Sequence, residues 1–424
     1  MSVGIQRLRE DADTVRRGAL DKGQDAADID LAIELDARRR NVSGEADALR
    51  AERKDVSARM GTALKAGEAG AETLRVESRE IGERIENLER ELSRIETDLE
   101  AALLRIPNPA DADVPVGPPE ATMTVREWGD PVAPDADGWQ RRPHWEIGER
   151  LGILDLPAGA KVTGSGFPIY RGAGSRLQRT LINLFLDMHT SEHGMTEIWP
   201  PALVNAESAR GTGQIPDKEE QMYVVTRDDL YLVPTAEVPV TNIHRDEIIE
   251  ADRLPIRYVA YSPCFRREAG AAGAKTRGIL RVHQFDKVEM VAFTAPQDSV
   301  ATMEWMTQCA EAVLQRLGLA YRVRLLSTGD MGFTQAKTYD LEVWSPGVGE
   351  WLEVSSVSNF RDFQARRMNI RYRPEPRAKP EMLHTLNGSG LALARTVAAL
   401  LEVYQQPDGS VALPDILSGV GSLA

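Results

Sequence analysis

The chain has little cysteine and no long apolar segment. Only two cysteines, Cys264 and Cys309, occur among its 424 residues, and they lie far apart, outside any metal-ligand spacing. This excludes a disulfide scaffold and a cysteine-based zinc site, and it suits a reducing compartment. No run approaches the roughly 20 apolar residues needed to cross a bilayer, and the charged stretch Met1 to Glu10 offers no apolar core for a signal peptide. We therefore expect a soluble, cytoplasmic protein with no membrane partner.

An excess of basic residues and the common nucleotide-binding motifs are missing as well. The formal net charge is -14 at pH 7, so an RNA partner would have to be met by local basic patches on an acidic body. Neither Gly-x-Gly-x-x-Gly nor Gly-Lys-Ser/Thr is present, which excludes the Rossmann and P-loop signatures. A nucleotide would have to bind on another kind of scaffold.

The N-terminal quarter has a seven-residue repeat. Its second half fills two seam positions with apolar side chains and the remaining positions with Glu and Arg, whereas its first half repeats more loosely. Between the halves, Gly61, Gly67 and Gly70 should break the helix, which predicts an antiparallel coiled-coil hairpin over about residues 30–106. Heptads specify only helix partners, so a dimerisation coiled coil or a spacer remains an alternative. The seam residues are Leu35, Val42, Leu49 and Val56 in the first half, and Leu74, Ile81, Leu88, Ile95, Ile85, Leu92, Leu99 and Ile106 in the second.

Prolines end this hairpin at Pro107 and Pro109. Residues 111–139, rich in Pro, Asp and Gly, have the composition of a linker. From residue 140 to 424, amphipathic helices such as 175–192 alternate with β-rich runs at 256–262, 287–294 and 351–360. This pattern predicts an α+β domain with a mainly antiparallel sheet flanked by helices. Three parts follow: a helical region 1–110, a linker 111–139 and a domain 140–424.

The segment 265–289 says most about function. It reads Phe-Arg-Arg-Glu-Ala-Gly from Phe265, then Arg-Gly-Ile-Leu-Arg-Val-His-Gln-Phe from Arg277, and it closes with Asp-Lys-Val-Glu from Asp286. Apolar runs around a Gly/Ala turn predict a hairpin. Arginines on its neighbouring strands would form forked donors suited to a polyphosphate, and Phe285 would offer a flat face to a base. A salt-bridged surface hairpin is the alternative.

These residues resemble motif 2 of the class II aminoacyl-tRNA synthetases, and their exact sequence is similar to that of the seryl-tRNA synthetases. Four further elements match that family in order and spacing: residues 211–216 (Gly-Thr-Gly-Gln-Ile-Pro), 235–239 (Thr-Ala-Glu-Val-Pro), 353–356 (Glu-Val-Ser-Ser) and 384–390 (His-Thr-Leu-Asn-Gly-Ser-Gly). The resemblance covers essentially the whole chain. It implies a class II catalytic domain preceded by a helical arm that embraces the long variable arm and elbow of a tRNA, with Arg and Lys residues of the arm as candidate phosphate contacts.

For ATP, the resemblance implies that Arg266 holds the α-phosphate, Glu268 accepts from the adenine amino group, and Arg281 lies near the terminal phosphates. Phe285 and Arg395 would cover the two faces of the adenine. Because charge accumulates on the phosphates during activation, fixed cations matter more than a general base. The catalytic residues would be Arg266, Arg281 and Arg395, and the ATP-binding residues Arg266, Arg267, Glu268, Val282, Phe285, Glu353, Val354, Ser355, Ser356 and Arg395. Simple sheet packing is the alternative for Phe285 and Val282.

The family also places a metal on the Glu-Val-Ser-Ser element. Glu353 and Ser356 supply the hard oxygens that Mg²⁺ accepts beside substrate phosphates. Strict alternation along a strand would put these two side chains on opposite faces of the sheet. A bulge or twist is therefore expected between them, or one of the two assignments is wrong.

For serine, the resemblance points to Thr235, Ala236, Glu237, Glu289 and Ser389. A site that hydrogen-bonds the buried hydroxyl rejects alanine strongly, because its own groups would be left unpaired. Taken alone, Glu289 would suit a sheet-edge salt bridge. Ser389, in an Asn-Gly-Ser-Gly turn before a helix over 391–404, would suit a turn or helix cap.

By resemblance, the chain activates L-serine with ATP and transfers it to the 3′-terminal ribose of serine tRNA and also of selenocysteine tRNA. Motif 1, in the helix from Ser175 and in Glu197 to Pro201, implies a homodimer. Ala274 and Lys275 depart from the usual basic-then-acidic pair of the motif 2 loop, which affects the contacts expected with the tRNA acceptor end. Two rivals are a paralogue that loads a carrier protein, which would lack the long arm, and a non-catalytic RNA-binding relative, which would have lost Arg266, Glu353 or Arg395.

Overall fold

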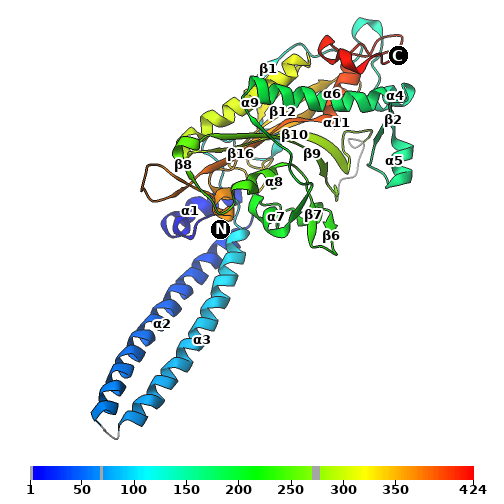
Figure 1. Cartoon of the computed structure of the whole chain (residues 1–424). Coiled ribbons are helices and arrows are strands. Elements are labelled where there is room, and N and C mark those ends of the chain that lie inside the picture. The colour runs from blue at the N-terminus through cyan, green and yellow to red at the C-terminus, as the bar shows by residue number, and fades with distance from the viewer. Residues whose placement is uncertain (1–2, 67–69, 270–276) are drawn as a thin grey trace. The chain divides into compact units, whose positions relative to one another are not determined.

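The computed structural model describes residues 3–66, 70–269 and 277–424. The chain divides into two compact units, Met1–Pro107 and Asn108–Ala424 (Figure 1). No helix in the described ranges is long and apolar enough to span a membrane.

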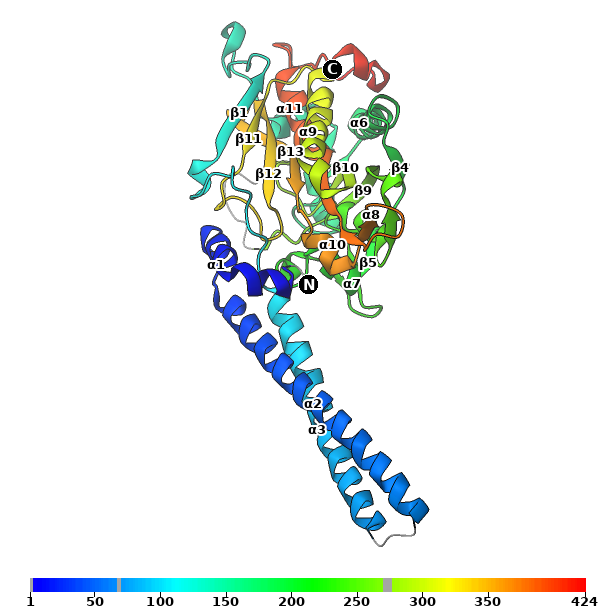
Figure 2. The same ribbon diagram turned by 90° about the vertical axis from the view of Figure 1, so that its left-hand side faces the viewer.

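The first unit consists of three helices, α1 (Ile5–Asp21), α2 (Ala27–Ala66) and α3 (Ala71–Leu104). Helices α2 and α3 run side by side in both views (Figures 1 and 2), and their apolar seam buries Leu49 and Val56 against Ile81 and Ile85. This confirms the antiparallel hairpin that the heptads predict. One local prediction is wrong, because Gly61 does not break the helix: α2 continues to Ala66.

The second unit is built on an eight-stranded sheet with the order β1-β11-β12-β13-β16-β10-β9-β4. Each neighbouring pair is antiparallel except β4 with β9, which confirms the α+β prediction. The strands are β1 (Met123–Trp128), β4 (Thr196–Ile198), β9 (Ile256–Phe265), β10 (Gln284–Thr294), β11 (Tyr321–Leu325), β12 (Lys337–Ser345), β13 (Glu350–Asn359) and β16 (His384–Ala392).

Helices α6 (Ala173–Asp187), α9 (Ser299–Arg316) and α11 (Leu393–Val403) pack on one face of this sheet. The reason is visible in the residue spacing. On β10, Val288, Met290 and Ala292 alternate into the same core as these helices, so the intervening residues must face the other side. That other side carries Phe285, Lys287 and Glu289, and it is where the candidate site lies.

Shorter elements complete the unit. They include three small sheets, with strand orders β5-β7-β6, β15-β14-β8 and β2-β3. The helices are α4 (His144–Arg150), α5 (Leu156–Val162), α7 (Ala206–Thr212), α8 (Glu237–Thr241) and α10 (Phe363–Met368). The strands are β2 (Leu154–Asp155), β3 (Ile169–Tyr170), β5 (Leu203–Asn205), β6 (Val224–Val225), β7 (Leu230–Leu232), β8 (Ile248–Glu250), β14 (Arg371–Arg373) and β15 (Glu381–Met382).

Two further segments differ from the sequence-based expectation. Part of the segment interpreted as a linker forms β1, which pairs with β11 at the edge of the sheet. In the motif 2 hairpin, Arg277 to Leu280 form turns, Arg281 follows them, and β10 starts only at Gln284. Arg281 therefore reaches the cleft from the connection between β9 and β10, not from a strand.

The Asn-Gly-Ser-Gly segment is a strand and not a turn, so that prediction is wrong. Asn387 to Gly390 lie in the middle of β16. The glycines serve close packing here. A Cβ atom on Gly388 would lie 2.9 Å from Cγ2 of Val357, and one on Gly390 would lie 2.3 Å from Nε2 of His189. Local turn chemistry is overridden because only glycine leaves room for these neighbours.

Candidate active site

Two adjoining cavities of about 270 and 340 Å³ open beside the strands on the sheet face opposite α6, α9 and α11. They form one continuous cleft, because they share Arg266, Glu268, Arg281, Lys287, Glu353 and Ser389. The sequence-predicted residues that line the cleft are Thr235, Glu237, Arg266, Glu268, Arg281, Val282, Phe285, Glu289, Glu353, Val354, Ser356, Ser389 and Arg395.

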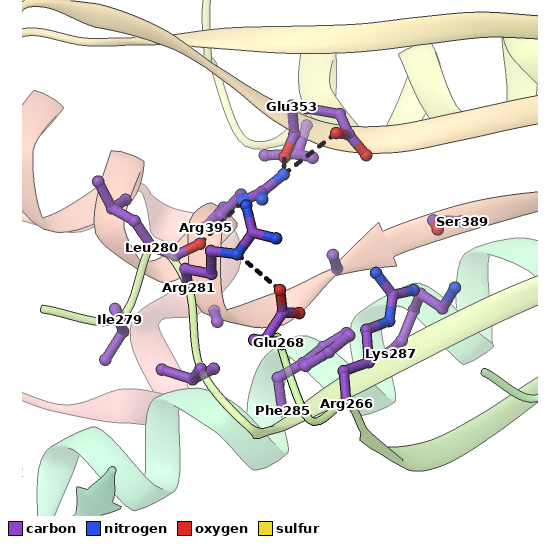
Figure 3. A pocket seen from close by; sticks show the side chains of 14 residues that line it. Arg266, Glu268, Ile279, Leu280, Arg281, Phe285, Lys287, Glu353, Ser389 and Arg395 are labelled. Carbon is purple, nitrogen blue, oxygen red and sulfur yellow. Dashed lines mark hydrogen bonds and ion pairs between the residues drawn. The ribbon is translucent and has the colours of Figure 1, made fainter. Parts of the chain in front are cut away.

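The smaller cavity is lined by arginines that are held by carboxylates and backbone carbonyls. Arg395 donates from Nε to the carbonyl of Leu280 (3.1 Å) and from Nη1 to the carbonyl of Glu353 (2.8 Å). Arg281 donates to the carboxylate of Glu268 at 2.6 Å. In Figure 3, Arg395 and Glu353 lie together at one side of this cavity, and Phe285, Arg266 and Lys287 lie at the other.

Two features at the start of the loop after β9 show that this part of the cleft has a specific conformation. The guanidinium of Arg266 stacks over the ring of Phe285, 5.1 Å from its centroid. Glu268 has a positive φ of 49°, a left-handed conformation that costs a non-glycine residue of the order of 1 kcal/mol or more and is often found at functional sites.

Strand β13 contains the bulge that the metal assignment requires. Its register with β12 shifts, so that Ser355 pairs with Leu341 while Glu353 pairs with Glu342, and Val354 is the extra residue. As a result, Glu353 and Ser356 line the same cavity despite their spacing of three.

An acidic residue that the sequence did not single out lies beside them. Asp340 on β12 is directly opposite Ser356. Burial, and then the charge of Glu353, raises the pKa of Asp340 well above its usual value. Its Oδ1 is buried and accepts no hydrogen bond from the described residues. Within those residues, no group of three or more His, Cys, Asp or Glu side chains is arranged to hold a metal ion by itself.

The larger cavity contains a cross-strand pair at its floor. Glu289 on β10 is directly opposite Ser389 on β16, and the Ser389 hydroxyl donates to Glu289 at 3.3 Å. Glu289 also forms a 2.8 Å ion pair with Lys287. Because β10 lies between β9 and β16, this is an interior pair, and the sheet-edge alternative for Glu289 is excluded.

A second buried carboxylate, Glu237, starts α8 and is only 7% exposed. It accepts a 2.7 Å hydrogen bond from Nε2 of Gln364. The orientation of that amide is fixed, because its Oε1 accepts from the hydroxyl of Thr385 at 2.7 Å. Burial, and then the charge of Glu289, raises the pKa of Glu237 to about 7.

Three predicted residues do not line the cleft. Arg267 is exposed and donates to the carbonyl of Glu220 (2.9 Å). Ser355 is buried and donates to the carbonyl of Ser389 (2.5 Å), and Ala236 is fully buried. Ala274 and Lys275, the departures in the motif 2 loop, lie outside the described residues.

Conversely, sequence reasoning missed several residues that border the cleft or hold its side chains, among them Lys287, Asp340 and Gln364. Lys287 lies within the motif 2 segment itself. Its position two residues before Glu289 puts both side chains on one face of a strand, and this spacing could have identified it. Nothing in the local sequence marks Asp340 or Gln364, because their partners lie on helices and strands that are distant in the sequence.

Comparison with known families agrees with this arrangement. The family described as tRNA synthetase class II core domain (G, H, P, S and T) matches residues 223–404, and the seryl-tRNA synthetase N-terminal domain matches residues 3–110. The serine--tRNA ligase of Gemmatimonas aurantiaca is 52% identical over 416 residues, which are 97% of each chain. That of Geobacillus sp. strain WCH70 is also 52% identical and covers 98% of this chain and 97% of its own.

Solved structures show the same likeness. Seryl-tRNA synthetase from Pyrococcus horikoshii, crystallised with ATP, has a TM-score of 0.92 at 37% identity and covers 98% of this chain and 97% of its own. The cytoplasmic serine-tRNA ligase of Naegleria fowleri, in complex with AMP, has a TM-score of 0.87 at 29% identity, with coverage of 99% and 97%.

The raised pKa of Glu237 predicts that Glu237→Gln stabilises the folded protein at alkaline pH. A carboxyl group whose pKa rises from 4.5 to about 7 on folding costs stability as the pH increases through that interval, and the cost stays constant above it. For a shift of this size the limit is about 3 kcal/mol. In urea unfolding, the free energy of unfolding of the variant should exceed that of the wild type by more at pH 8 than at pH 5.

The exposed Glu207 (65% side-chain exposure) offers a matched control, since Glu207→Gln should change stability little at either pH. Equal effects of Glu237→Gln at the two pH values would contradict the buried, high-pKa carboxyl group.

Proposed function

The chain belongs to the seryl-tRNA synthetases, and from this premise we propose that the cleft on the sheet face opposite α6, α9 and α11 is where ATP and L-serine react. The activity is ATP-dependent activation of L-serine followed by charging of tRNA. The observation that carries the placement is the junction of the two cavities: the arginine-lined one and the carboxylate-lined one share six residues. Adenylate formation needs such a junction, because the carboxylate of the amino acid must reach the α-phosphate.

In the first step, a serine carboxylate oxygen bonds to the α-phosphorus while the bond to the β-phosphate oxygen breaks and pyrophosphate leaves. Arg266 lines both cavities, so it is positioned for the α-phosphate, where negative charge develops. Arg281 would exchange its Glu268 partner for the terminal phosphates. Glu268 would then be free to accept from the adenine amino group.

The adenine ring fits between the two sides of the smaller cavity. Phe285 lies on one side and Arg395 on the other (Figure 3), and Arg395 is held by the carbonyls of Leu280 and Glu353. Stacking on Phe285 requires the Arg266 guanidinium, which now covers that ring, to move toward the phosphates. The contact with Arg395 would be of the cation–π type. Val282, Val354 and Ser355 would contribute walls and backbone around the nucleotide.

The larger cavity suits serine by charge. Glu237 and Glu289 lie close enough for the charge of one to raise the pKa of the other, and Lys287 compensates one of them. The serine ammonium would supply the second positive charge. Ser389 and the Thr235–Glu237 segment would serve the hydroxyl, whose loss in alanine would leave buried groups unpaired.

The residues around the bulge suit Mg²⁺, which binds hard oxygens of carboxylates and hydroxyls beside substrate phosphates. The unsatisfied buried oxygen of Asp340 and the crowding of Asp340 with Glu353 both fit a nearby cation. We therefore assign Glu353 and Ser356 as the residues that would hold the ion, with Asp340 beside them. A bound ion would neutralise phosphate charge during transfer.

For tRNA, we assign the α2–α3 hairpin. With 34 residues in α3, its length is about 50 Å at the helical rise, enough to read the shape and phosphates of a structured RNA. Arg38 and Arg50 pair with Glu91 and Glu89 across the hairpin, and these pairs are exposed. Exposed pairs are weak, so such arginines can turn to phosphates. Serine tRNA is the substrate, and selenocysteine tRNA is a further one if it presents the same shape.

In this assignment residues 1–110 bind tRNA, 140–424 catalyse, and 111–139 join them. A homodimer is the proposed assembly. Trp199, which follows β4, is 79% exposed, and a large exposed aromatic side chain next to Pro200 and Pro201 is typical of a surface that a partner covers. The cytoplasm remains the predicted compartment, in keeping with two free cysteines.

The direct test is ATP–pyrophosphate exchange with each of the twenty amino acids. Serine alone should support exchange, and alanine should be weaker by about 10⁴-fold because it lacks the hydroxyl that the site hydrogen-bonds. Arg266→Ala should lower the serine-dependent rate by at least about 10²-fold without unfolding the protein.

Arg267→Ala is the matched control, because this neighbouring residue is exposed, donates to the carbonyl of Glu220 and does not line the cleft. The exchange rate of this variant should stay within about twofold of the wild type. No exchange with any amino acid would contradict the proposed function. Equal loss in the two arginine variants would contradict the placement of Arg266.

Deleting residues 35–99 and bridging the ends with a short Gly/Ser linker should spare serine-dependent exchange but abolish most tRNA charging. The reason is that the hairpin has its own apolar seam and the cleft lies in the other unit. The affinity of the intact protein for tRNA should also fall steeply with salt. Charging at nearly the full rate by the truncated protein would show that the arm is a spacer.

A further inference from the structure

A fully buried carboxylate, Glu402 on α11, lies behind the wall of the nucleotide cavity and has no role in the chemistry described so far. Its Oε2 accepts from the backbone N–H groups of Gly347 (2.8 Å) and Val348 (3.1 Å) and from the hydroxyl of Ser345. Its Oε1 accepts from both the backbone N–H and Nδ1 of His144, each at 2.8 Å. Only a group that acts purely as an acceptor satisfies such a set of donors.

This arrangement fixes the tautomer of His144, which is itself fully buried. Because Glu402 accepts, Nδ1 of His144 must carry the proton and donate. Nε2 is then left as an acceptor, and the backbone N–H of Ile279 points at it from 3.2 Å. The imidazole thus connects a buried carboxylate to the backbone of the motif 2 connection.

The connection that His144 holds is part of the cavity wall. Ile279 and Leu280 both line the nucleotide cavity, and the carbonyl of Leu280 accepts from Nε of Arg395 at 3.1 Å (Figure 3). The hydrogen bond to Ile279 therefore lies one residue from the acceptor that orients Arg395.

Gly278 makes this approach possible. It has a φ of +72°, and a Cβ atom at that position would lie only 2.3 Å from Nε2 of His144. Any larger residue would push the imidazole away from the backbone N–H of Ile279. Next to it, the Arg277 guanidinium stacks over Trp145, 4.8 Å from the ring centroid.

We propose that Glu402 and His144 are positioning residues for ATP: Glu402 fixes the Nδ1–H tautomer of His144, and Nε2 of His144 then fixes the Ile279–Leu280 wall and, through the Leu280 carbonyl, Arg395. Neither residue touches the nucleotide. The inference rests on the proposed function of the cleft, and it adds two residues that lie outside the matching motifs of the sequence.

Two substitutions of His144 separate positioning from simple packing. The amide nitrogen of Asn takes the place of Nδ1, so His144→Asn keeps a donor for Glu402 but loses the acceptor for Ile279. The amide oxygen of Gln takes the place of Nε2, so His144→Gln keeps the acceptor for Ile279. For His144→Asn we expect the KM for ATP and the calorimetric Kd for ATP to rise about tenfold, as the loss of one buried hydrogen bond would give. His144→Gln should stay within about threefold of the wild type.

The KM for serine should change by less than about twofold in both variants, since the serine side of the cleft does not depend on Ile279. Gly278→Ala approaches the same hydrogen bond from the other side and should reproduce the ATP-selective loss, which keeps the test valid if a His144 variant does not fold. Glu311→Gln is the matched control. Glu311 is also a buried carboxylate, held by Arg126 and Tyr321, but it does not line the cleft, so this variant should lower the Tm and leave ATP binding unchanged.

Unchanged ATP binding in folded His144→Asn and Gly278→Ala would overturn the inference. Equal increases in the KM values for ATP and serine, with a loss of Tm like that of Glu311→Gln, would also overturn it, because they would show a merely structural role. Failure of the proposed function itself would appear separately, as an absence of serine-dependent exchange in the wild-type protein.

Discussion

The charged side chains of the cleft must find partners of opposite charge on their own face of the sheet, because α6, α9 and α11 cover the opposite face with an apolar core. Lys287 pairs with Glu289, Arg281 with Glu268 and Arg395 with Glu353. Two carboxylates in this neighbourhood, Glu237 and Asp340, form no ion pair within the described parts of the chain. Burial and a neighbouring acid raise the pKa of each.

These two uncompensated acids lie where positive charge is expected to arrive. Glu237 lines the cavity assigned to serine, whose ammonium carries one positive charge. Asp340 is opposite Ser356, on the element assigned to Mg²⁺. Ionising either acid without a compensating cation is therefore costly, and in the proposed assignment the serine ammonium and the bound cation would lower that cost. A site of this kind trades stability for binding.

The backbone of the sheet makes this charge pattern possible. The bulge at Val354 brings Glu353 and Ser356 to one side, and the register of β10 with β16 brings Glu289 opposite Ser389. Behind the nucleotide wall, Glu402 and His144 extend the same principle, because a buried acceptor holds an imidazole that in turn holds a backbone N–H.

Periodic and motif-based features could be predicted from the sequence, whereas contacts between distant segments could not. The heptads predict α2 and α3, since the pattern is local, and the conflict between Glu353 and Ser356 predicts the bulge. The prediction of a turn at Asn-Gly-Ser-Gly is wrong, because the glycines make room for the side chains of Val357 and His189 and do not mark a chain reversal. Gln364 and Glu402 act on residues 127 and 258 positions away, so no local pattern marks them.

The central claim, that the serine ammonium compensates the buried carboxyl group of Glu237, is tested most directly by counting protons. Calorimetric titration of the full-length protein with serine at pH 6, in buffers of different ionisation enthalpy, should show release of close to one proton, because an ammonium beside Glu237 favours its charged form. The release should nearly vanish at pH 8.5 and in Glu237→Gln. Serine binding at pH 6 without proton release, or with the same release in Glu237→Gln, would contradict the account.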